Sequence, residues 1–309
     1  FIASPTTVIW HFIFMAMVIY VCYKGIGGIE KASKIMLPAL FVLLIIIIFR
    51  SVSLKGSMEG IKFIFAPKKG FSLASVNAAL GQVFYSLSLC MGITITYGSY
   101  LSKKENIPKS CAVVAGMDTL LAILAGIAIF PAVFVFGLEP GQGPGLVFVT
   151  LPKVFGAMSG GSIFAIAFFI LMFFAALTSA IALLEVVVSF AIDSWGWSRN
   201  KSVAVMGITV AVLGIPSALS SGLLADVTIL NYSVFDFIGM IADNILLPIG
   251  GILMCYFIGW KFDITKLTDE MEQGCPSFKI KKLWIASIKY IAPILLIIVT
   301  LSGFIRVYN

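Results

Sequence analysis

Eight long runs of apolar residues decide what this chain can fold into. Each run is long enough to cross the roughly 30 Å hydrocarbon core of a membrane as an α-helix, and none alternates like a membrane β-strand. Only 11% of the 309 residues are charged, too few to cover a water-soluble fold. We therefore expect an all-α, polytopic membrane helix bundle that forms one transmembrane domain over residues 1–309. The expected spans are 6–23, 35–54, 77–101, 110–136, 161–192, 202–219, 228–258 and 284–305.

Lysine and arginine residues predict the orientation of the bundle. Fourteen of the 21 lie in the connections 24–34, 102–109, 193–201 and 259–289, so the positive-inside rule places these connections in the cytoplasm. Phe1 then begins on the outer side, and we expect that the chain starts within a longer protein. The net charge of +7 forms no basic stripe with interleaved aromatic residues, so nucleic acid is not expected as a partner.

One acidic residue lies well inside an apolar run. Asp118 belongs to the 110–136 window, where an ionisable group costs about 2.5–3.5 kcal/mol on insertion scales and is usually retained for function. A carboxylate is the hard oxygen donor that a sodium ion or a proton would need. The alternative is an acid near the start of the helix, close to the membrane interface.

Hydroxyl and small residues in two other runs could supply further oxygen ligands. Gln82 and Ser86 share a helical face, and the weak helix formers at 88–92 allow an interruption that would free backbone groups inside the membrane. Helix packing explains these small residues equally well. In the 161–192 run, Thr178 and Ser179 could complete an oxygen cage for sodium or could bond back to their own helix.

Enzymatic chemistry finds little support. His11 is the sole histidine, and the chain contains neither His-Glu-x-x-His nor Gly-x-Ser-x-Gly. Asp118 and Asp243 could in principle form an aspartyl-protease pair, but no known motif surrounds them. The five cysteines form no Cys-x-x-Cys pair and are interpreted as free thiols. We expect that the protein is not an enzyme.

Three segments carry a resemblance to a known family. Residues 82–100 (QVFYSLSLCMGITITYGSY) resemble the sixth helix of the neurotransmitter:sodium symporters, residues 24–38 the junction of the fourth and fifth helices, and residues 173–179 (FFAALTS) the eighth. The motifs keep the family order, and the resemblance extends over almost the whole chain. It implies the inverted-repeat, leucine-transporter-like fold, incomplete at the N-terminus, with helices four to eleven present and the N-terminal helices one to three missing.

The resemblance implies two sodium ions as cofactors. Ser86 and Asp118 match the first sodium site, and Ala175, Thr178 and Ser179 match the second, Ala175 through its backbone carbonyl.

It also implies a pocket without chloride. Gln82 matches a chloride ligand of the family, but Asp118 stands where Asn is usual and Ala122 where chloride-dependent members have Ser. A fixed negative charge at Asp118 would repel chloride and compensate the sodium charge in its place, so transport is predicted to be chloride-independent.

The family's amino-acid pocket and gates also have matches in this chain. The pocket residues implied by the resemblance are Tyr85, Ser86, Ser88, Met91, Ser179 and Leu183. The implied inner gate contains Ser99, Tyr100, Glu185 and Asp193, whose usual arginine partner would lie upstream of Phe1. Asp236 resembles an outer-gate acid, although the principal gate carboxylate of many members aligns with Gly239. Cys90 replaces a pocket glycine.

The resemblance predicts sodium-coupled symport of an amino acid or a related small amine across the bacterial cytoplasmic membrane, by alternating access. The expected partners are this small-molecule substrate, the lipid bilayer and the missing N-terminal helices of the same protein. Two alternatives stay open: a proton-coupled or uncoupled amino-acid permease of similar fold, and a non-transporting sensor or inactive fragment.

Overall fold

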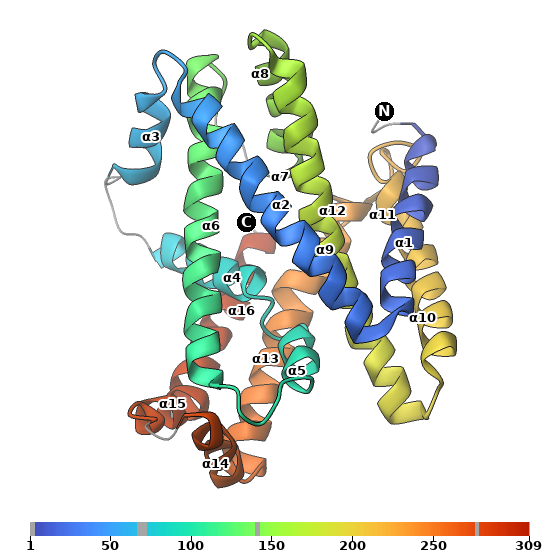
Figure 1. Ribbon diagram of the computed structural model, residues 1–309, viewed down its shortest axis with the longest axis vertical. Helices are drawn as coiled ribbons and strands as arrows, with labels where there is room; N and C mark the ends of the chain where they lie inside the picture. The colour runs from blue at the N-terminus through green and yellow to red at the C-terminus, as the bar shows by residue number, and fades with distance from the viewer. Residues whose placement is uncertain (1–3, 67–72, 140–142, 276–277, 309) are drawn as a thin grey trace. The chain divides into compact units, whose positions relative to one another are not determined.

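Long apolar helices dominate the computed structural model, which describes residues 4–66, 73–139, 143–275 and 278–308 (Figure 1). Seven helical segments in these ranges are long and apolar enough to cross a membrane. They are Thr6–Tyr23 (α1), Gly25–Val52 (α2), Ile107–Val135 (α6), Gly161–Trp195 (α9), Arg199–Leu219 (α10 and α11), Val234–Lys261 (α12 to η3) and Lys281–Leu301 (α15, η4 and the first part of α16). The predicted all-α, multi-pass membrane fold is confirmed.

Shorter elements fill the connections and divide several spans. They are α3 (Met58–Phe65), α4 (Leu73–Ser86), α5 (Ile93–Gly98), α7 (Gly143–Gly145), η1 (Leu146–Thr150), α8 (Leu151–Ala157), α10 (Arg199–Leu213), α11 (Ile215–Leu219), α12 (Val234–Ile241), η2 (Ala242–Leu246), α13 (Leu247–Tyr256), η3 (Phe257–Lys261), α14 (Ile264–Gly274), α15 (Lys281–Ala286), η4 (Ser287–Ile291) and α16 (Ala292–Tyr308).

Asp263 caps α14 by accepting a hydrogen bond from the Thr265 amide at 3.0 Å. Hydrogen bonds from the Thr265 side chain and amide hold the pKa of this carboxyl below its usual value.

The expected span at 77–101 is divided in the structure. Helix α4 ends at Ser86 and α5 begins at Ile93, so of the two interpretations of the small residues the structure shows the interruption. Between the two helices, Ser88, Cys90 and Gly92 have φ angles of 51°, 66° and 79°. Left-handed residues cannot continue a right-handed helix, and they turn the chain between α4 and α5.

Two helix starts lie well away from those expected. Helix α2 begins at Gly25 rather than near residue 35, so its first turns contain charged residues. Two of them, Glu30 and Lys34, lie one turn apart and form an ion pair at 2.6 Å, which supports the helix. The 228–258 run opens with a hairpin rather than a helix. Its strands β1 (Thr228–Ile229) and β2 (Tyr232–Ser233) pair antiparallel around Leu230 and Asn231, whose positive φ angles suit a two-residue turn.

The chain divides into two compact units. The first comprises residues 1–23, 71–115 and 181–309, and in it α1 packs along α10 and α11 (Figure 1). His11 Nε2 lies 2.8 Å from the Ala211 carbonyl, and the Thr7 hydroxyl donates to the Ala218 carbonyl at 3.0 Å. Polar side chains in α1 thus bond to backbone carbonyls of the neighbouring helices.

The second unit comprises residues 24–70 and 116–180. Its apolar core joins α2, α6, α8 and α9 through side chains that include Ile47, Val133, Val154 and Phe168. Pro131 lies inside α6, and the next amide, that of Ala132, donates to the buried Ser51 hydroxyl of α2 at 3.1 Å. A polar side chain thereby satisfies a backbone group beside the proline.

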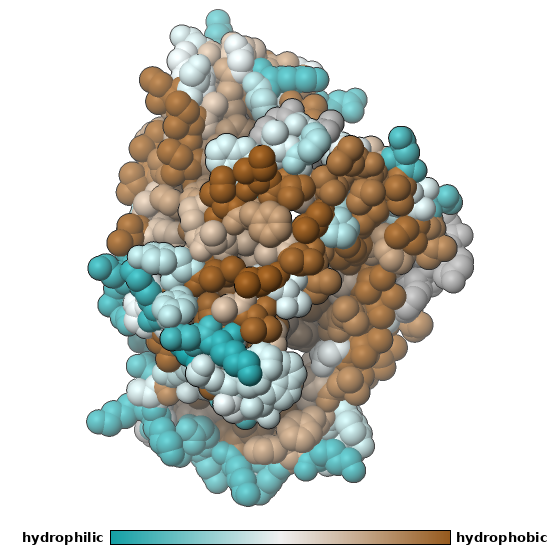
Figure 2. Space-filling model, turned by 90° about the vertical axis from the view of Figure 1, so that its right-hand side faces the viewer, coloured by the Kyte–Doolittle hydropathy of each residue, from teal (hydrophilic) through white to brown (hydrophobic). Residues whose placement is uncertain are grey.

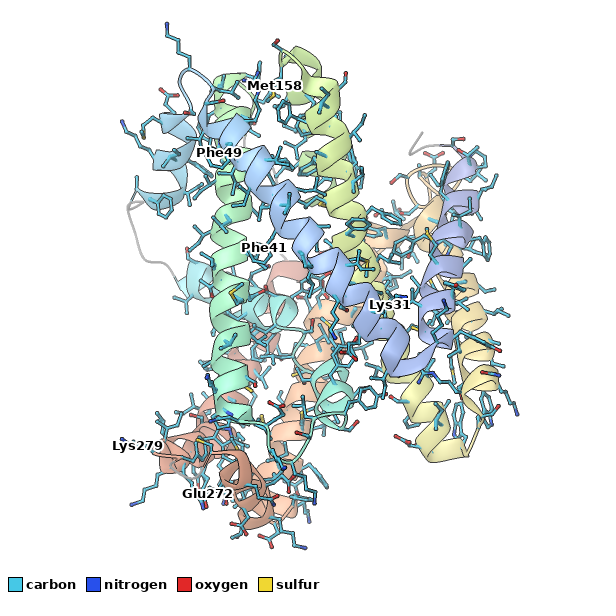
Figure 3. All side chains as sticks on the ribbon, viewed as in Figure 1. Lys31, Phe41, Phe49, Met158, Glu272 and Lys279 are labelled. Atoms are coloured by element: carbon cyan, nitrogen blue, oxygen red, sulfur yellow. The ribbon has the colours of Figure 1, made fainter. Side chains whose placement is uncertain are left out.

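Apolar side chains cover wide areas of the surface in the face that Figure 2 shows. On α2, Phe49 is 74% exposed, and Figure 3 labels it near the end of this helix. Such side chains are suited to contact lipid rather than water. In the first unit, Glu272 lies near the end of α14 and Lys279 in the connection to α15 (Figure 3), and Glu272 forms an ion pair with Lys281 at 2.9 Å.

Candidate functional site

A fully buried carboxylate is the centre of the polar cluster in the first unit. Glu185 lies on α9 and is 0% exposed. Its Oε1 accepts hydrogen bonds from Arg199 Nη1 at 3.0 Å and from the Tyr100 hydroxyl at 2.8 Å, and its Oε2 accepts from Arg199 Nη2 at 2.7 Å. A buried charge is tolerated when it is both paired and hydrogen-bonded, and here three donors satisfy the carboxylate.

Arg199 also binds the end of α1. Its Nε and Nη2 donate to the Cys22 carbonyl at 3.1 and 2.7 Å. The last carbonyls of a helix have no partner within that helix, so a cation there is favourable both as a donor and toward the helix dipole. One guanidinium therefore connects α1, α9 and α10, while Tyr100 adds the segment after α5.

Other predicted inner-gate residues lie on the same two segments. The Ser99 hydroxyl donates to the Thr96 carbonyl at 2.7 Å, and the buried Thr96 hydroxyl lies 3.5 Å from that of Ser189 on α9. Asp193 is exposed near the end of α9. The structure brings Tyr100 and Glu185 together directly, while Ser99 bonds within its own segment.

Close backbone packing fixes α5 against α9 beside this cluster. A Cβ atom built on Gly92 would lie 2.8 Å from Cγ1 of Val186, the residue after Glu185. Real Cβ atoms are not found so close to a neighbouring carbon. Two features therefore favour glycine at the end of the break: the positive φ of residue 92 and its close contact with Val186.

Sequence reasoning missed Arg199 as a member of this cluster. It counted the residue only as one of the basic charges of a connector, and the arginine expected upstream of Phe1 stays a prediction. Arg199 is the first residue of α10, where a cation opposes the helix dipole.

The predicted sodium and substrate residues are divided between the two units. The first unit contains Gln82, Tyr85 and Ser86 on α4, Ser88 and Met91 in the break, and Leu183 on α9. The second unit contains Asp118 on α6 and Ala175, Thr178 and Ser179 on α9. Tyr85 is 57% exposed, and Ser86 and Asp118 are half-buried. Within the second unit, the Thr178 hydroxyl donates to the Ala175 carbonyl at 2.9 Å, which is the bond back to its own helix that was left open as the alternative to a sodium ligand.

Asp236, the predicted outer-gate acid, has a local structural role. Ser233 caps α12, and its hydroxyl accepts from the Asp236 amide at 3.1 Å and donates to the Asp236 carboxylate at 2.7 Å. This pair stabilises the start of the helix, where an acidic residue is also favourable toward the dipole. Asp243 lies in η2, the π-helical segment that directly follows α12.

Comparison with known proteins identifies relatives along the whole chain. Residues 2–309 match the model of the sodium:neurotransmitter symporter family. The chain is 39% identical over 293 residues to an uncharacterized sodium-dependent transporter of Bacillus subtilis and 37% identical over 309 residues to one of Haemophilus influenzae. These alignments cover 94% and 97% of this chain, but 65% and 66% of the relatives, so the chain spans about two thirds of their length.

A solved structure agrees with the fold. The crystal structure of MhsT in complex with L-phenylalanine is similar with a TM-score of 0.87 and 44% sequence identity, over 98% of this chain and 70% of that one. At this identity the likeness extends to sequence as well as topology. The chain belongs to the sodium:neurotransmitter symporter family.

Proposed function

We propose that the protein carries out sodium-coupled symport of an amino acid or a related small amine across the bacterial cytoplasmic membrane. The break between α4 and α5, with left-handed residues at 88, 90 and 92, is the observation that carries this proposal. Interrupted membrane helices expose backbone groups that bind substrates and ions in transporters. The similar transporters are named sodium-dependent, and MhsT binds L-phenylalanine, which supports both the coupling ion and the substrate class.

Two sodium sites are proposed from the oxygen donors of the chain. Ser86 and Asp118 would contribute to the first, and Ala175, Thr178 and Ser179 to the second. The Thr178 hydroxyl and the Ala175 carbonyl lie 2.9 Å apart, so both oxygens could contact one ion once the hydroxyl proton turns away from the carbonyl. Hard oxygen donors of this kind suit an alkali cation.

The substrate would bind at the break. Tyr85, Ser86, Ser88 and Met91 would line the pocket from α4 and the break, with Ser179 and Leu183 from α9. Exposed backbone carbonyls would accept hydrogen bonds from the substrate ammonium. Asp236 would contribute to the outer gate in addition to its hydrogen bonds with Ser233, the cap of α12.

The Glu185 cluster would act in the inner gate. Its ion pair and the Tyr100 hydrogen bond connect the segment after α5 to α1, α9 and α10, with Ser99 and Asp193 nearby in the sequence. Opening this side would require at least some of these bonds to break, and sodium and substrate would favour one state by binding it more tightly. This is the basis of alternating access.

The proposed test is uptake by the full-length protein in proteoliposomes. A panel of radiolabelled amino acids that includes L-phenylalanine is offered with a sodium gradient, and then with choline in place of sodium. Symport predicts uptake that the substitution abolishes. Uptake retained in choline and driven by a proton gradient would favour the permease, and sodium-dependent binding without any uptake would favour a sensor.

A further inference from the structure

A cysteine lies where the break would more easily hold a glycine. Cys90 has a φ of 66°, a left-handed conformation that strains any residue with a Cβ atom, whereas Gly92 adopts a similar φ without that strain. Strained backbone of this kind persists only where the surrounding structure holds it. The side-chain contacts of Cys90 should therefore show what holds the break.

The thiol of Cys90 occupies the space that a side chain at Gly251 would fill. Gly251 lies on α13 and is buried. A Cβ atom built on it would lie 2.6 Å from Cys90 Sγ and 2.9 Å from Cδ1 of Leu296, which is 1% exposed on α16. The missing side chain at Gly251 and the added side chain at Cys90 are complementary, and the thiol packs between α13 and α16.

The break is thus held from two sides within the first unit. Cys90 packs on α13 through its thiol, and Gly92 packs on α9 at Val186. Met91 lies between Cys90 and Gly92 in the sequence, and Ser88 lies two residues before Cys90. Because both are proposed substrate contacts, a displacement of Cys90 would carry them with it.

We propose that Cys90 is a positioning residue for the substrate site, and that its contact with Gly251 sets where the break, with Ser88 and Met91, meets the substrate. The inference rests on the proposed transport function. It assigns to the thiol a role outside the pocket, since the side chain faces α13. It also makes Gly251, which touches no substrate in this proposal, a determinant of substrate affinity.

The test uses two neighbouring glycines of α13 in the full-length protein. Gly251→Ala should displace the thiol and raise the Kd for L-phenylalanine, or for whichever common amino acid binds most tightly, about tenfold. Gly250→Ala is the matched control, because its Cβ would meet the Cys90 carbonyl at an ordinary 3.6 Å; its Kd should stay within twofold of the parent. Cys90→Gly should restore the affinity of Gly251→Ala to within about threefold, since glycine suits the left-handed φ.

A second measurement does not depend on transport. With Cys22, Cys111, Cys255 and Cys275 replaced by alanine, the rate at which N-ethylmaleimide alkylates Cys90 reports the packing of its thiol. Gly251→Ala should raise this rate at least fivefold, and Gly250→Ala should leave it unchanged. An unchanged rate in Gly251→Ala would show that the thiol does not occupy this space and would overturn the inference.

The combined outcomes separate this inference from the proposed function. A displaced thiol with an unchanged Kd would overturn the positioning role alone. Rescue by Leu296→Val but not by Cys90→Gly would assign the effect to the packing of α16 and would also overturn it. A parent protein without sodium-dependent binding of any amino acid would instead overturn the proposed function, and the role in substrate affinity with it.

Discussion

Arg199 holds the buried carboxylate of Glu185 through two parallel hydrogen bonds, at 3.0 Å from Nη1 and 2.7 Å from Nη2. The glutamate side chain is 0% exposed and the arginine side chain 26%, so the carboxylate is fully buried while the arginine stays partly exposed. Because the same guanidinium also donates to the Cys22 carbonyl, its loss would leave both a charge and a helix end without these donors.

Arg199→Met is therefore expected to destabilise the protein strongly. Removing one partner of a buried ion pair costs about 3–5 kcal/mol, because the remaining charge has no compensation. The melting temperature in detergent should fall by several degrees, and Glu185→Gln in the same chain should recover part of the loss. Lys201→Met is the control, since Lys201 contacts the Trp197 ring at 4.4 Å from its surface position; equal losses in the two variants would contradict the assignment.

Asp118→Asn is expected to make transport depend on chloride. The parent should take up its amino acid equally well with chloride or gluconate, because in the proposed sodium site the aspartate would supply the negative charge that compensates sodium. Without that charge, uptake in gluconate should fall at least tenfold and chloride should restore it. Asp236→Asn should leave uptake independent of chloride, and a parent protein that needs chloride would refute the prediction.

Thr178→Val is expected to raise the sodium concentration for half-maximal uptake about tenfold. The substitution keeps the shape of the side chain but removes the hydroxyl oxygen that lies 2.9 Å from the Ala175 carbonyl. Thr209→Val is a matched control, because the Thr209 hydroxyl makes the same kind of bond to its own helix, to the Val205 carbonyl at 2.8 Å. An equal shift in both variants would indicate a helix effect rather than a sodium ligand.

Ser51→Ala is expected to lower stability without changing the sodium dependence. The Ser51 hydroxyl accepts from the Ala132 amide at 3.1 Å beside Pro131, and a buried amide left without an acceptor costs about 1–3 kcal/mol. Thermal unfolding in detergent should show the loss. Ser53→Ala, which removes an exposed hydroxyl bonded to the Arg50 carbonyl, should change the melting temperature by less than half as much.

The membrane helices could be predicted because lipid leaves the backbone few alternatives. A chain in hydrocarbon has to satisfy its backbone hydrogen bonds internally, so a sufficiently long apolar run becomes a helix. The run 6–23 accordingly matches α1, Thr6–Tyr23. The start of α2 was less predictable, since charged residues that end an apolar run can continue a helix through pairs such as Glu30 with Lys34.

The interruption of the 77–101 run was visible in the sequence only as a group of small residues. Serine and glycine are common both in breaks and in packed helices, so composition favours neither. The contact of Gly92 with Val186 and the contact of Cys90 with Gly251 join residues about 94 and 161 positions apart, and such pairings follow from tertiary packing.

The sequence by itself determined that this chain crosses a membrane repeatedly, and its motifs indicated the family, because apolar length and local motifs are local properties. Only the tertiary structure decided that Arg199 binds Glu185, and that the Cys90 thiol lies against Gly251. A buried carboxylate has to be paired with a cation within hydrogen-bond distance. Which cation lies that close depends on how the helices pack, and the order of residues along the chain does not specify it.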